Sequence, residues 1–584
     1  ARHAMDTPPG ALTRRSWAPA WALLLVLVVA AALRLAGLNW DGGLGAHPDE
    51  RYVVGVAESL RWPDLLNPLE IDPGYSYGHL PLYALALTRG LAPRTDPLLV
   101  GRVLAATISL ATVALTYVLG RQTGGRWVGL TAAGITALAP LCLQQARFYT
   151  ADALLTLSAV AALIVAVRLA ARGRGRDALL AGAFAGLAVG SKLTGALLAL
   201  PLAAACVLGA ANGAARGTAA WRYGLWCALG GLVAFAATNP FALVELGRFA
   251  RNAAEQAAIA RGALDVPYTR QFHGTWPYLY PAAQLLRWGL GVLPGLAALG
   301  GWGLLLARAV RRSPAPAEWV LLAWSAPTAA FMGGLYAKYP RYMLPVLPVF
   351  AICGARLLLE WAEGRLWPVQ RIKGWLRWAP LTLVVGALLM RAVAYSAMLT
   401  GPHPWQSAAA YLREEVMPSS RVVLEEWDQP LLGEDSGSEV RVLPLYDADS
   451  EAKWVAAGDM LAGADYVVIA SRRAYRALAG WPERYPLTAR YYRLLFEGRL
   501  GFEPVACFGR APRLGDLLAF VDDPAAGLGF VLPDECRSQA AIALNLGPLD
   551  ESLVVYDHPQ VIIFRRTATA PDGAALAALL SSGL

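Results

Sequence analysis

Charged residues are scarce in this chain of 584 residues: they make up 16% of it, against 56% hydrophobic residues. A soluble protein of average composition has about a quarter charged residues, so this scarcity excludes an ordinary soluble globule. The mean hydropathy of +0.42 points the same way. Many apolar runs reach the roughly 18–25 residues that cross about 30 Å of hydrocarbon, which indicates a polytopic membrane protein.

Cysteine is also scarce, with only six in the chain. Cys142, Cys206, Cys227 and Cys353 fall within apolar runs, and their spacing is not that of a metal site. The other two, Cys507 and Cys536, lie in a polar C-terminal part. A disulfide between them and a pair of buried thiols both remain open from the sequence alone.

The net charge of +9 raises the question of a nucleic-acid partner. The arginines, however, are concentrated in short segments between apolar runs. This is the distribution of the positive-inside rule, in which cytoplasmic loops collect Lys and Arg. We therefore expect membrane lipids and no nucleic acid as partners.

Counting apolar runs predicts about 11 transmembrane helices, with one break at Gly190-Ser191-Lys192 because residues 179–210 are too long for a single span. Arg14 and Arg15 precede the first span and predict a cytoplasmic N-terminus. An odd number of spans then places the C-terminus on the outer side. We expect a cytoplasmic tail at residues 1–16, in part an expression-vector remnant, and a membrane domain at 17–400.

Residues 401–584 lose the long apolar runs and read as a soluble extracytoplasmic α/β domain. Gln406–Val416 has helical spacing. Short runs rich in β-branched residues at 421–424, 466–469 and 560–564 predict strands.

The predicted topology brings charged and aromatic residues to one membrane face. His47-Pro48-Asp49-Glu50-Arg51 follows the first span, and further polar residues follow at later turns on the same side. Ionisable groups near hydrocarbon are rare unless they pair or function. The candidates on this face are Asp49, Glu50, Arg51, Arg147, Tyr149, Asp152, Lys192, Lys338, Arg341 and Tyr342.

Each of these motifs also has a structural interpretation. Asp49 and Glu50 fit a solvated loop, Asp152 fits a helix N-cap, and Lys192 fits a lysine that extends to the membrane surface. Residues 338–342 fit an interfacial belt of aromatics and cations. A nucleotide-binding loop at Gly190–Gly195 is excluded, because the phosphate-loop spacing and its preceding strand are absent. Taken together, one carboxylate pair and several cations suit binding of an anionic lipid head group beside a group that accepts a proton.

Four of these motifs occur in an order that resembles the GT-C glycosyltransferases, and most closely glycosyltransferase family 39, which includes protein O-mannosyltransferases and aminoarabinose transferases. They are HPDE at 47–50, RFYTAD at 147–152, GSK at 190–192 and KYPRYMLP at 338–345. The resemblance covers about residues 17–400.

The resemblance implies an inverting transfer of a sugar from a polyprenyl-phosphate carrier to an acceptor hydroxyl at the outer face. Asp49 would be the general base, and Glu50 would orient the sugar or tune Asp49. Lys192, Arg341 and Arg147 would stabilise the departing lipid phosphate. Further substrate-binding candidates are Arg51, Tyr77, Tyr149, Asp152, His273, Lys338 and Tyr342.

We expect no metal and no cofactor, since the nearest relatives do not require a metal for their chemistry, although a divalent cation between Asp49 and Asp152 stays open, with His47, His79 or His273 as additional ligands. Two other functions also stay open. A lipid-linked sugar transporter would place charges similarly, although the chain lacks the internal repeat typical of one. A membrane-anchored, non-catalytic cell-envelope assembly protein would need no such charges. The expected location is a bacterial inner membrane. The sugar, the carrier length and the acceptor (protein, lipid or glycan) are undetermined.

Overall fold

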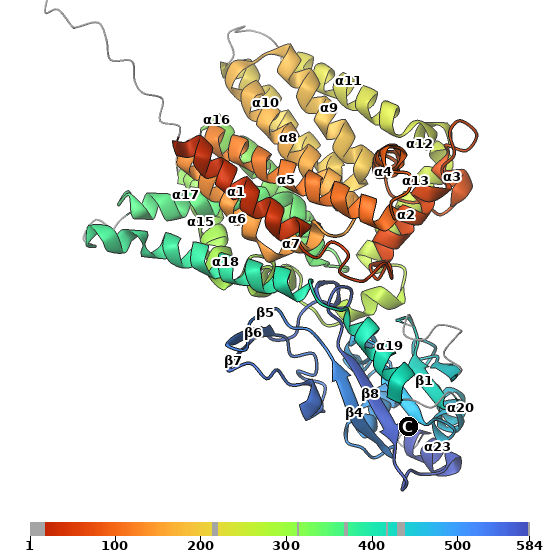
Figure 1. The fold of residues 1–584 in the computed structure, drawn as a ribbon. Helices are drawn as coiled ribbons and strands as arrows, with labels where there is room; N and C mark the ends of the chain where they lie inside the picture. Colours follow the sequence, from red (N-terminus) through yellow and green to blue (C-terminus); the bar gives the residue numbers. More distant parts are fainter. Residues whose placement is uncertain are drawn as a thin grey trace, which may run out of the picture.

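The structure of the protein is a computed structural model, and the residues described from it are 18–212, 220–311, 315–366, 372–415, 419–428 and 438–581. A bundle of helices occupies the chain up to residue 399, and an α/β region follows and packs against one end of the bundle (Figure 1). The predicted tail at 1–16, with Arg14 and Arg15, and the helix end at Val416 lie outside the described residues.

Among the described residues, six helical stretches are long and apolar enough to cross a membrane. This confirms the prediction of a multi-pass helical membrane protein. Several consist of a short 3-10 helix that runs directly into an α-helix. The six are α5 (Pro97–Gly124), α8 (Ala151–Arg172), η1 (Leu193–Leu198) with α10 (Ala199–Asn212), α15 (Val292–Arg311), η4 (Pro340–Val346) with α17 (Leu347–Ala362), and η6 (Gly374–Trp378) with α18 (Ala379–Met398).

Other helices of the bundle are shorter or less apolar, so the total of 11 spans stays a prediction. The apolar run at residues 127–143 forms two helices, because Pro140 cannot donate a hydrogen bond to the preceding turn. The break predicted at Gly190-Ser191-Lys192 is present between α9 and η1. These helices are α1 (Ala18–Leu35), α6 (Arg126–Leu138), α7 (Pro140–Gln145), α9 (Gly175–Ser191), α11 (Ala220–Thr238) and α16 (Pro316–Gly334).

Helices α9 and α11 pack so closely that glycine is required at their contact. A Cβ atom at Gly182 would lie 2.0 Å from the Cys227 carbonyl oxygen, and one at Gly230 would lie 2.1 Å from that of Leu179. Small residues at such spacing let two backbones approach in a membrane, where van der Waals packing drives helix association. This contact holds the α9 end, and therefore the break after it, in place.

Shorter helices cover the end of the bundle that faces the α/β region. They come from two connections, one between α1 and α5 and one between α11 and α15. They are α2 (Pro48–Ser59), α3 (Pro68–Ile71), α4 (Leu80–Leu91), α12 (Pro240–Val244), α13 (Leu246–Arg261), η2 (Pro267–Phe272), α14 (Leu279–Gln284) and the π-turn η3 (Leu285–Gly289).

The α/β region contains a five-stranded sheet in the order β2-β1-β3-β8-β4, parallel in its first three strands and antiparallel in the other two. The strands predicted at 421–424, 466–469 and 560–564 are β1, β3 and β8. A smaller sheet has the order β5-β6-β7. The strands are β1 (Arg421–Glu425), β2 (Glu439–Leu443), β3 (Tyr466–Ile469), β4 (Phe502–Phe508), β5 (Arg513–Leu514), β6 (Leu518–Val521), β7 (Ile542–Asn545) and β8 (Val561–Arg566).

Successive side chains of β3 point to opposite faces of the sheet, and the two faces belong to two different hydrophobic cores. Val467 and Ile469 point to a core shared with α20 to α23, whereas Val468 points to the core that continues into the helical bundle. The helices are α19 (Pro404–Glu415), α20 (Glu451–Ala462), α21 (Arg473–Leu478), α22 (Pro486–Phe496) and α23 (Gly573–Ser581), with short 3-10 helices η8 (Asp534–Cys536) and η9 (Glu551–Leu553). Cys507 and Cys536 form a disulfide, which resolves the alternative that the sequence left open.

The glycine contact between α9 and α11 gives a direct test. Gly230→Ala is expected to lower the stability by about 1–3 kcal/mol, because the added methyl group overpacks a backbone contact. Thermal unfolding in detergent measures it. Gly224→Ala, on the same helix but with open space around it, is the matched control and should not lower the transition, because alanine is the better helix former. Equal effects of both variants would contradict the packing argument.

Candidate active site

Asp49 and Arg341 form an ion pair at the end of the bundle that faces the α/β region. Arg341 Nη1 lies 2.5 Å from Asp49 Oδ2, and the side chains are 11% and 26% exposed, respectively. Asp49 is in the first turn of α2 and Arg341 in the first turn of η4, and each of these helices has a proline at its start. Residues nearly 300 positions apart therefore meet at one point.

The surroundings of Asp49 keep its carboxylate ionised. Burial by itself would raise the pKa of Asp49, but the charge of Arg341 and a smaller contribution from Lys192 outweigh it and lower the pKa. A base of this kind carries no proton at neutral pH. It is, however, weakened as a base for as long as Arg341 stays on it.

A second ion pair belongs to the same group of residues. Lys192 Nζ lies 2.8 Å from Asp152 Oδ1, and the ammonium sits 4.9 Å from the centre of the Tyr342 ring. Lys192 follows the last residue of α9 in extended backbone, and Asp152 is in the first turn of α8. The break in the bundle therefore delivers a cation to the site.

Arg102 of α5 holds the start of α2, the helix that carries Asp49. Its guanidinium donates to both Asp41 oxygens at 2.8 and 2.9 Å and to Glu50 Oε2 at 2.8 Å, and all three side chains are buried. Glu50 also accepts a hydrogen bond of 3.0 Å from the backbone N–H of Tyr149. Adjacent helix residues point about 100° apart, so Glu50 turns inward to Arg102 while Asp49 faces Arg341.

His47 caps the same helix. Its Nδ1 accepts a hydrogen bond from the backbone N–H of Glu50 at 3.2 Å, which satisfies one of the free donors at the start of α2. Burial lowers the pKa of His47 to about 3, so the ring is neutral and carries its proton on Nε2.

The loop before α4 closes one side of the site. Gly78 donates to the Ser191 carbonyl oxygen at 3.2 Å, and a Cβ atom at Gly78 would lie 1.9 Å from the Gly190 carbonyl oxygen. Only glycine fits this approach. It places Tyr77 close enough to Asp49 and Arg341 for their charges to act on its hydroxyl, while burial raises the pKa of Tyr77 well above its usual value.

The α/β region supplies another wall. The Tyr556 ring lies 4.5 Å from the His47 ring, and the Arg473 guanidinium lies 5.6 Å from the centre of the Tyr556 ring. The next residue, Asp557, accepts hydrogen bonds from the Tyr395 hydroxyl at 2.6 Å and from Gln144 at 2.9 Å. Both donors belong to the bundle, so this segment is fastened to it.

The remaining predicted residues lie in other surroundings. Arg147 is buried and donates to backbone carbonyls at the end of α1, to Leu143 and to Ser396. The Tyr149 hydroxyl donates to the Pro81 carbonyl oxygen at 2.6 Å. Arg51 is exposed and donates to Gly45. Lys338 Nζ donates to the Tyr336 carbonyl oxygen at 2.9 Å.

His273 stacks on Trp481 of the α/β region, with ring centres 3.8 Å apart. The structure thus brings together Asp49, Arg341, Lys192, Asp152, Tyr342 and Tyr77. It places Arg147, Tyr149, Arg51, Lys338 and His273 in contacts with backbone or with another ring.

Two residues that organise the site are absent from the sequence prediction. Arg102 lies inside the apolar run at 98–119, and Asp41 lies just past the first span. A charge inside a span needs a partner, and this rule was the available signal. Tyr556 carried no such signal, because its role arises only from the contact between the two parts of the chain.

No group of three or more His, Cys, Asp or Glu side chains that could hold a metal ion occurs among the described residues. Asp49 and Asp152 are each paired with a cation instead. A divalent cation between Asp49 and Asp152 therefore stays an open alternative.

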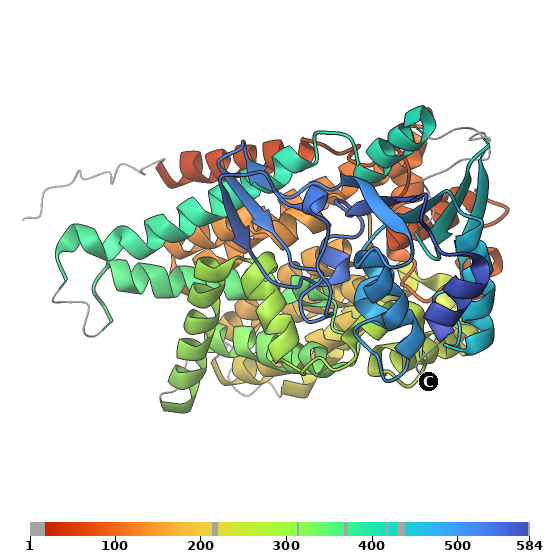
Figure 2. The same cartoon turned by 90° about the horizontal axis from the view of Figure 1, so that it is seen from below.

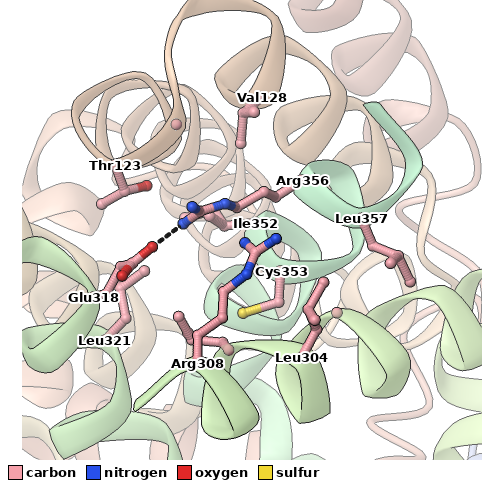
Figure 3. A pocket seen from close by; sticks show the side chains of 13 residues that line it. Thr123, Val128, Leu304, Arg308, Glu318, Leu321, Ile352, Cys353, Arg356 and Leu357 are labelled. Atoms are coloured by element: carbon pink, nitrogen blue, oxygen red, sulfur yellow. Dashed lines mark hydrogen bonds and ion pairs between the residues drawn. The ribbon is translucent and has the colours of Figure 1, made fainter. Parts of the chain in front are cut away.

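A pocket at the other end of α15 and α17 is a different environment (Figure 3). Arg308 pairs with Glu360 at 2.6 Å, and Arg356 pairs with Glu318 and Glu360. Each cation there is matched by a carboxylate, and neither Asp49 nor Arg341 lines this pocket. We do not assign the reaction to it.

Part of the helical bundle is similar in sequence to a known protein family. Residues 79–242 match the sequence profile of a family described as dolichyl-phosphate-mannose-protein mannosyltransferase. For these residues the match confirms the resemblance predicted from the motifs. It includes Asp152 and Lys192, and it stops short of Asp49 and Arg341. No curated protein matches the chain.

Solved structures with a similar arrangement include an Archaeoglobus fulgidus oligosaccharyltransferase, which is 15% identical with a TM-score of 0.49, over 87% of this chain and 76% of that one. Another is ArnT from Cupriavidus metallidurans bound to undecaprenyl phosphate, which is 17% identical with a TM-score of 0.47, over 79% of this chain and 95% of that one.

The buried Arg102 group predicts a large loss of stability on breaking it. Arg102→Leu leaves the Asp41 and Glu50 carboxylates without a partner and is expected to cost about 3–5 kcal/mol. Thermal unfolding in detergent measures the loss. Adding Asp41→Asn and Glu50→Gln to the same variant should recover part of it. Arg94→Leu, an exposed arginine just before α5, is the control. A loss no larger than that of Arg94→Leu would contradict this account.

Proposed function

We propose that the protein is an inverting glycosyltransferase of the GT-C type, which moves a sugar from a polyprenyl-phosphate carrier to an acceptor hydroxyl. The observation that carries the proposal is the meeting of Asp49 with Arg341, beside Lys192 and Asp152, at one end of a membrane bundle. A carboxylate base beside two cations suits the removal of a proton next to a phosphate that gains charge.

The reaction is a single displacement. Asp49 takes the proton of the acceptor hydroxyl as its oxygen attacks the anomeric carbon. The bond between that carbon and the phosphate oxygen breaks, and its electron pair leaves with the lipid phosphate. Arg341 and Lys192 stabilise the added charge on that phosphate. Attack from the side opposite the leaving group inverts the anomeric centre.

The ion pairs of the free protein give this site a way to respond to its donor. Arg341 and Lys192 are both bound to carboxylates, so a lipid phosphate must share or replace these partners. When Arg341 turns to the phosphate, Asp49 loses its main stabilising charge while it remains buried. Its pKa then rises, which makes it a stronger base only once the donor is in place.

Glu50 has a positioning role in this proposal, because its carboxylate is bound to Arg102 and to the backbone of Tyr149. In this proposal the sugar of the donor lies beside Tyr77 and Tyr342, because each of these tyrosines lies next to an ion pair. Arg147, Tyr149, Arg51, Lys338 and His273 are retained as proposed substrate-binding residues, without a step of their own in the reaction. The reaction requires no metal in this scheme.

We propose a location in a bacterial inner membrane, with the N-terminus in the cytoplasm. Residues 17–400 are the catalytic membrane domain, and 401–584 are an extracytoplasmic domain on the side of the site. The arginine-rich connections at the opposite end of the bundle support this orientation.

Asp49→Asn is expected to lower turnover by about 10²–10⁴-fold, the usual contribution of a general base, and to leave binding of the lipid phosphate in place. The measurement is single-turnover transfer from synthetic polyprenyl-phosphate sugars, after mass spectrometry of copurified lipid has selected the candidates. Asp64→Asn, an exposed residue after α2, is the control. A transporter would lose flux without any transfer product, and a scaffold would lose neither.

Arg341→Gln is expected to lower turnover by about 10²–10³-fold and to move the acid limb of kcat/KM to higher pH. The sign follows from burial, which raises the pKa of Asp49 once the opposing cation is gone. Infrared titration of the Asp49 carboxylate, identified by its loss in Asp49→Asn, measures the same shift without turnover. Arg61→Gln, an exposed arginine shortly after α2, is the control. An acid limb that stays in place would contradict the coupling.

A further inference from the structure

The small sheet β5-β6-β7 lies against the membrane bundle rather than at the far end of the α/β region. β5 packs against α18, and Figures 1 and 2 place the sheet alongside the half of α18 nearer to its C-terminal end. This is the part of α18 where the helix leaves the membrane toward the α/β region.

One face of this sheet is apolar, and α18 covers only part of it. β6 and β7 are parallel, with Leu518 opposite Ile542 and Phe520 opposite Leu544, so these four side chains share a face. On that face Phe520 is 7% exposed and lies 5.2 Å from the guanidinium of Arg391 in α18. The covered strand is therefore β6.

The same face continues uncovered on β7. Ile542 is 51% exposed and Leu544 is 45% exposed. Leu517, in the turn before β6, is 66% exposed. Apolar side chains gathered on one face of an edge strand are unfavourable in water and typical of a surface that contacts something else.

α18 also exposes an apolar surface, mainly on the side of the helix turned away from Arg391. Leu389, Met390 and Val393 are 45%, 45% and 41% exposed, and they lie on a helix that is long and apolar enough to span. Lipid covers such a helix face in a membrane. Because β5 packs against α18, the small sheet lies beside a span that lipid covers.

Arg391 indicates how far into the membrane the contact between α18 and the small sheet lies. Its guanidinium lies between the rings of Trp288 and Phe520, and it donates to the Arg287 carbonyl oxygen at 2.7 Å. Arginine flanked by aromatic rings is characteristic of the membrane–water boundary, where the charge stays near polar groups and the rings sit at head-group level. The sheet lies at this level.

We propose that the Ile542 and Leu544 face of β7 inserts into the leaflet on the side of the α/β region, so that the small sheet is a second membrane contact beside the helical bundle. The opposite face of β7, with Ala543, stays in water. The contact holds the α/β region close to the membrane. This inference does not depend on the proposed reaction.

The test uses single cysteine variants in lipid nanodiscs, labelled with an environment-sensitive fluorophore. All native cysteines are buried or in the disulfide, so an added exposed cysteine takes the label selectively. Ile542→Cys and Leu544→Cys are compared with Ala543→Cys on the other face of the same strand. Val455→Cys, exposed on α20 at the far side of the α/β region, is the second control.

Labels at 542 and 544 are expected to be quenched several-fold more by lipid-attached spin labels than labels at 543 and 455, which iodide in the water should quench instead. Equal iodide quenching at all four positions would overturn the proposal. Protection of 542 and 544 from both quenchers would also overturn it, because it would mean that a second protein copy covers this face.

Discussion

The site depends on the charge cluster that Arg102 forms with Asp41 and Glu50. It is buried inside the end of the bundle, where two carboxylates without a cation would be very unfavourable. Through Glu50 it fixes the first turn of α2, and through Asp41 it fixes the loop before that helix. Asp49 is therefore held by its neighbour, on a rigid helix start, with its own side chain free to take part in an ion pair.

Two adjacent residues have different roles in this arrangement. Glu50 holds the start of α2 in place, and Asp49 is the proposed base. Glu50 faces the protein interior and is saturated with donors, while Asp49 faces Arg341 at the partly exposed end. Lys192 and Asp152 form a second pair beside the first, and both pairs are neutral as a whole. A site with stored but balanced charge can respond to a phosphate without holding an uncompensated cation near lipid.

The α/β region takes part in this architecture through a segment near its C-terminal end. Asp557 is fastened to Tyr395 and Gln144, and this places Tyr556 against His47, the cap of the helix that carries Asp49. The two parts of the chain share a continuous hydrophobic core at the same place. Packing and hydrogen bonds together therefore set the position of the α/β region on the bundle. The proposed membrane contact of β7 would be a third constraint on that position.

Much of this was readable in the sequence. Apolar length predicts the membrane bundle because crossing hydrocarbon demands it, and a run too long for one helix predicts the break at Lys192. The β-rich runs predict β1, β3 and β8. Charges near hydrocarbon predict Asp49, Asp152, Lys192 and Arg341 as a group, because such charges need partners. The two parts of the chain follow from these patterns, whereas the transfer reaction stays a proposal that rests on the resemblance of the motifs to a family.

Which charges meet was decided only by the tertiary structure. Arg147 lies between two helices and was predicted to bind the phosphate, yet it binds backbone carbonyls, whereas Arg102, inside an apolar run, binds the two carboxylates. The roles of Glu50 and Tyr556 likewise depend on which side of a helix faces the core and on how a distant segment docks. One-dimensional patterns give the spacing along the chain and the cost of leaving a charge unpaired. The identity of its partner comes from packing between segments that are far apart in the chain, which local patterns do not encode.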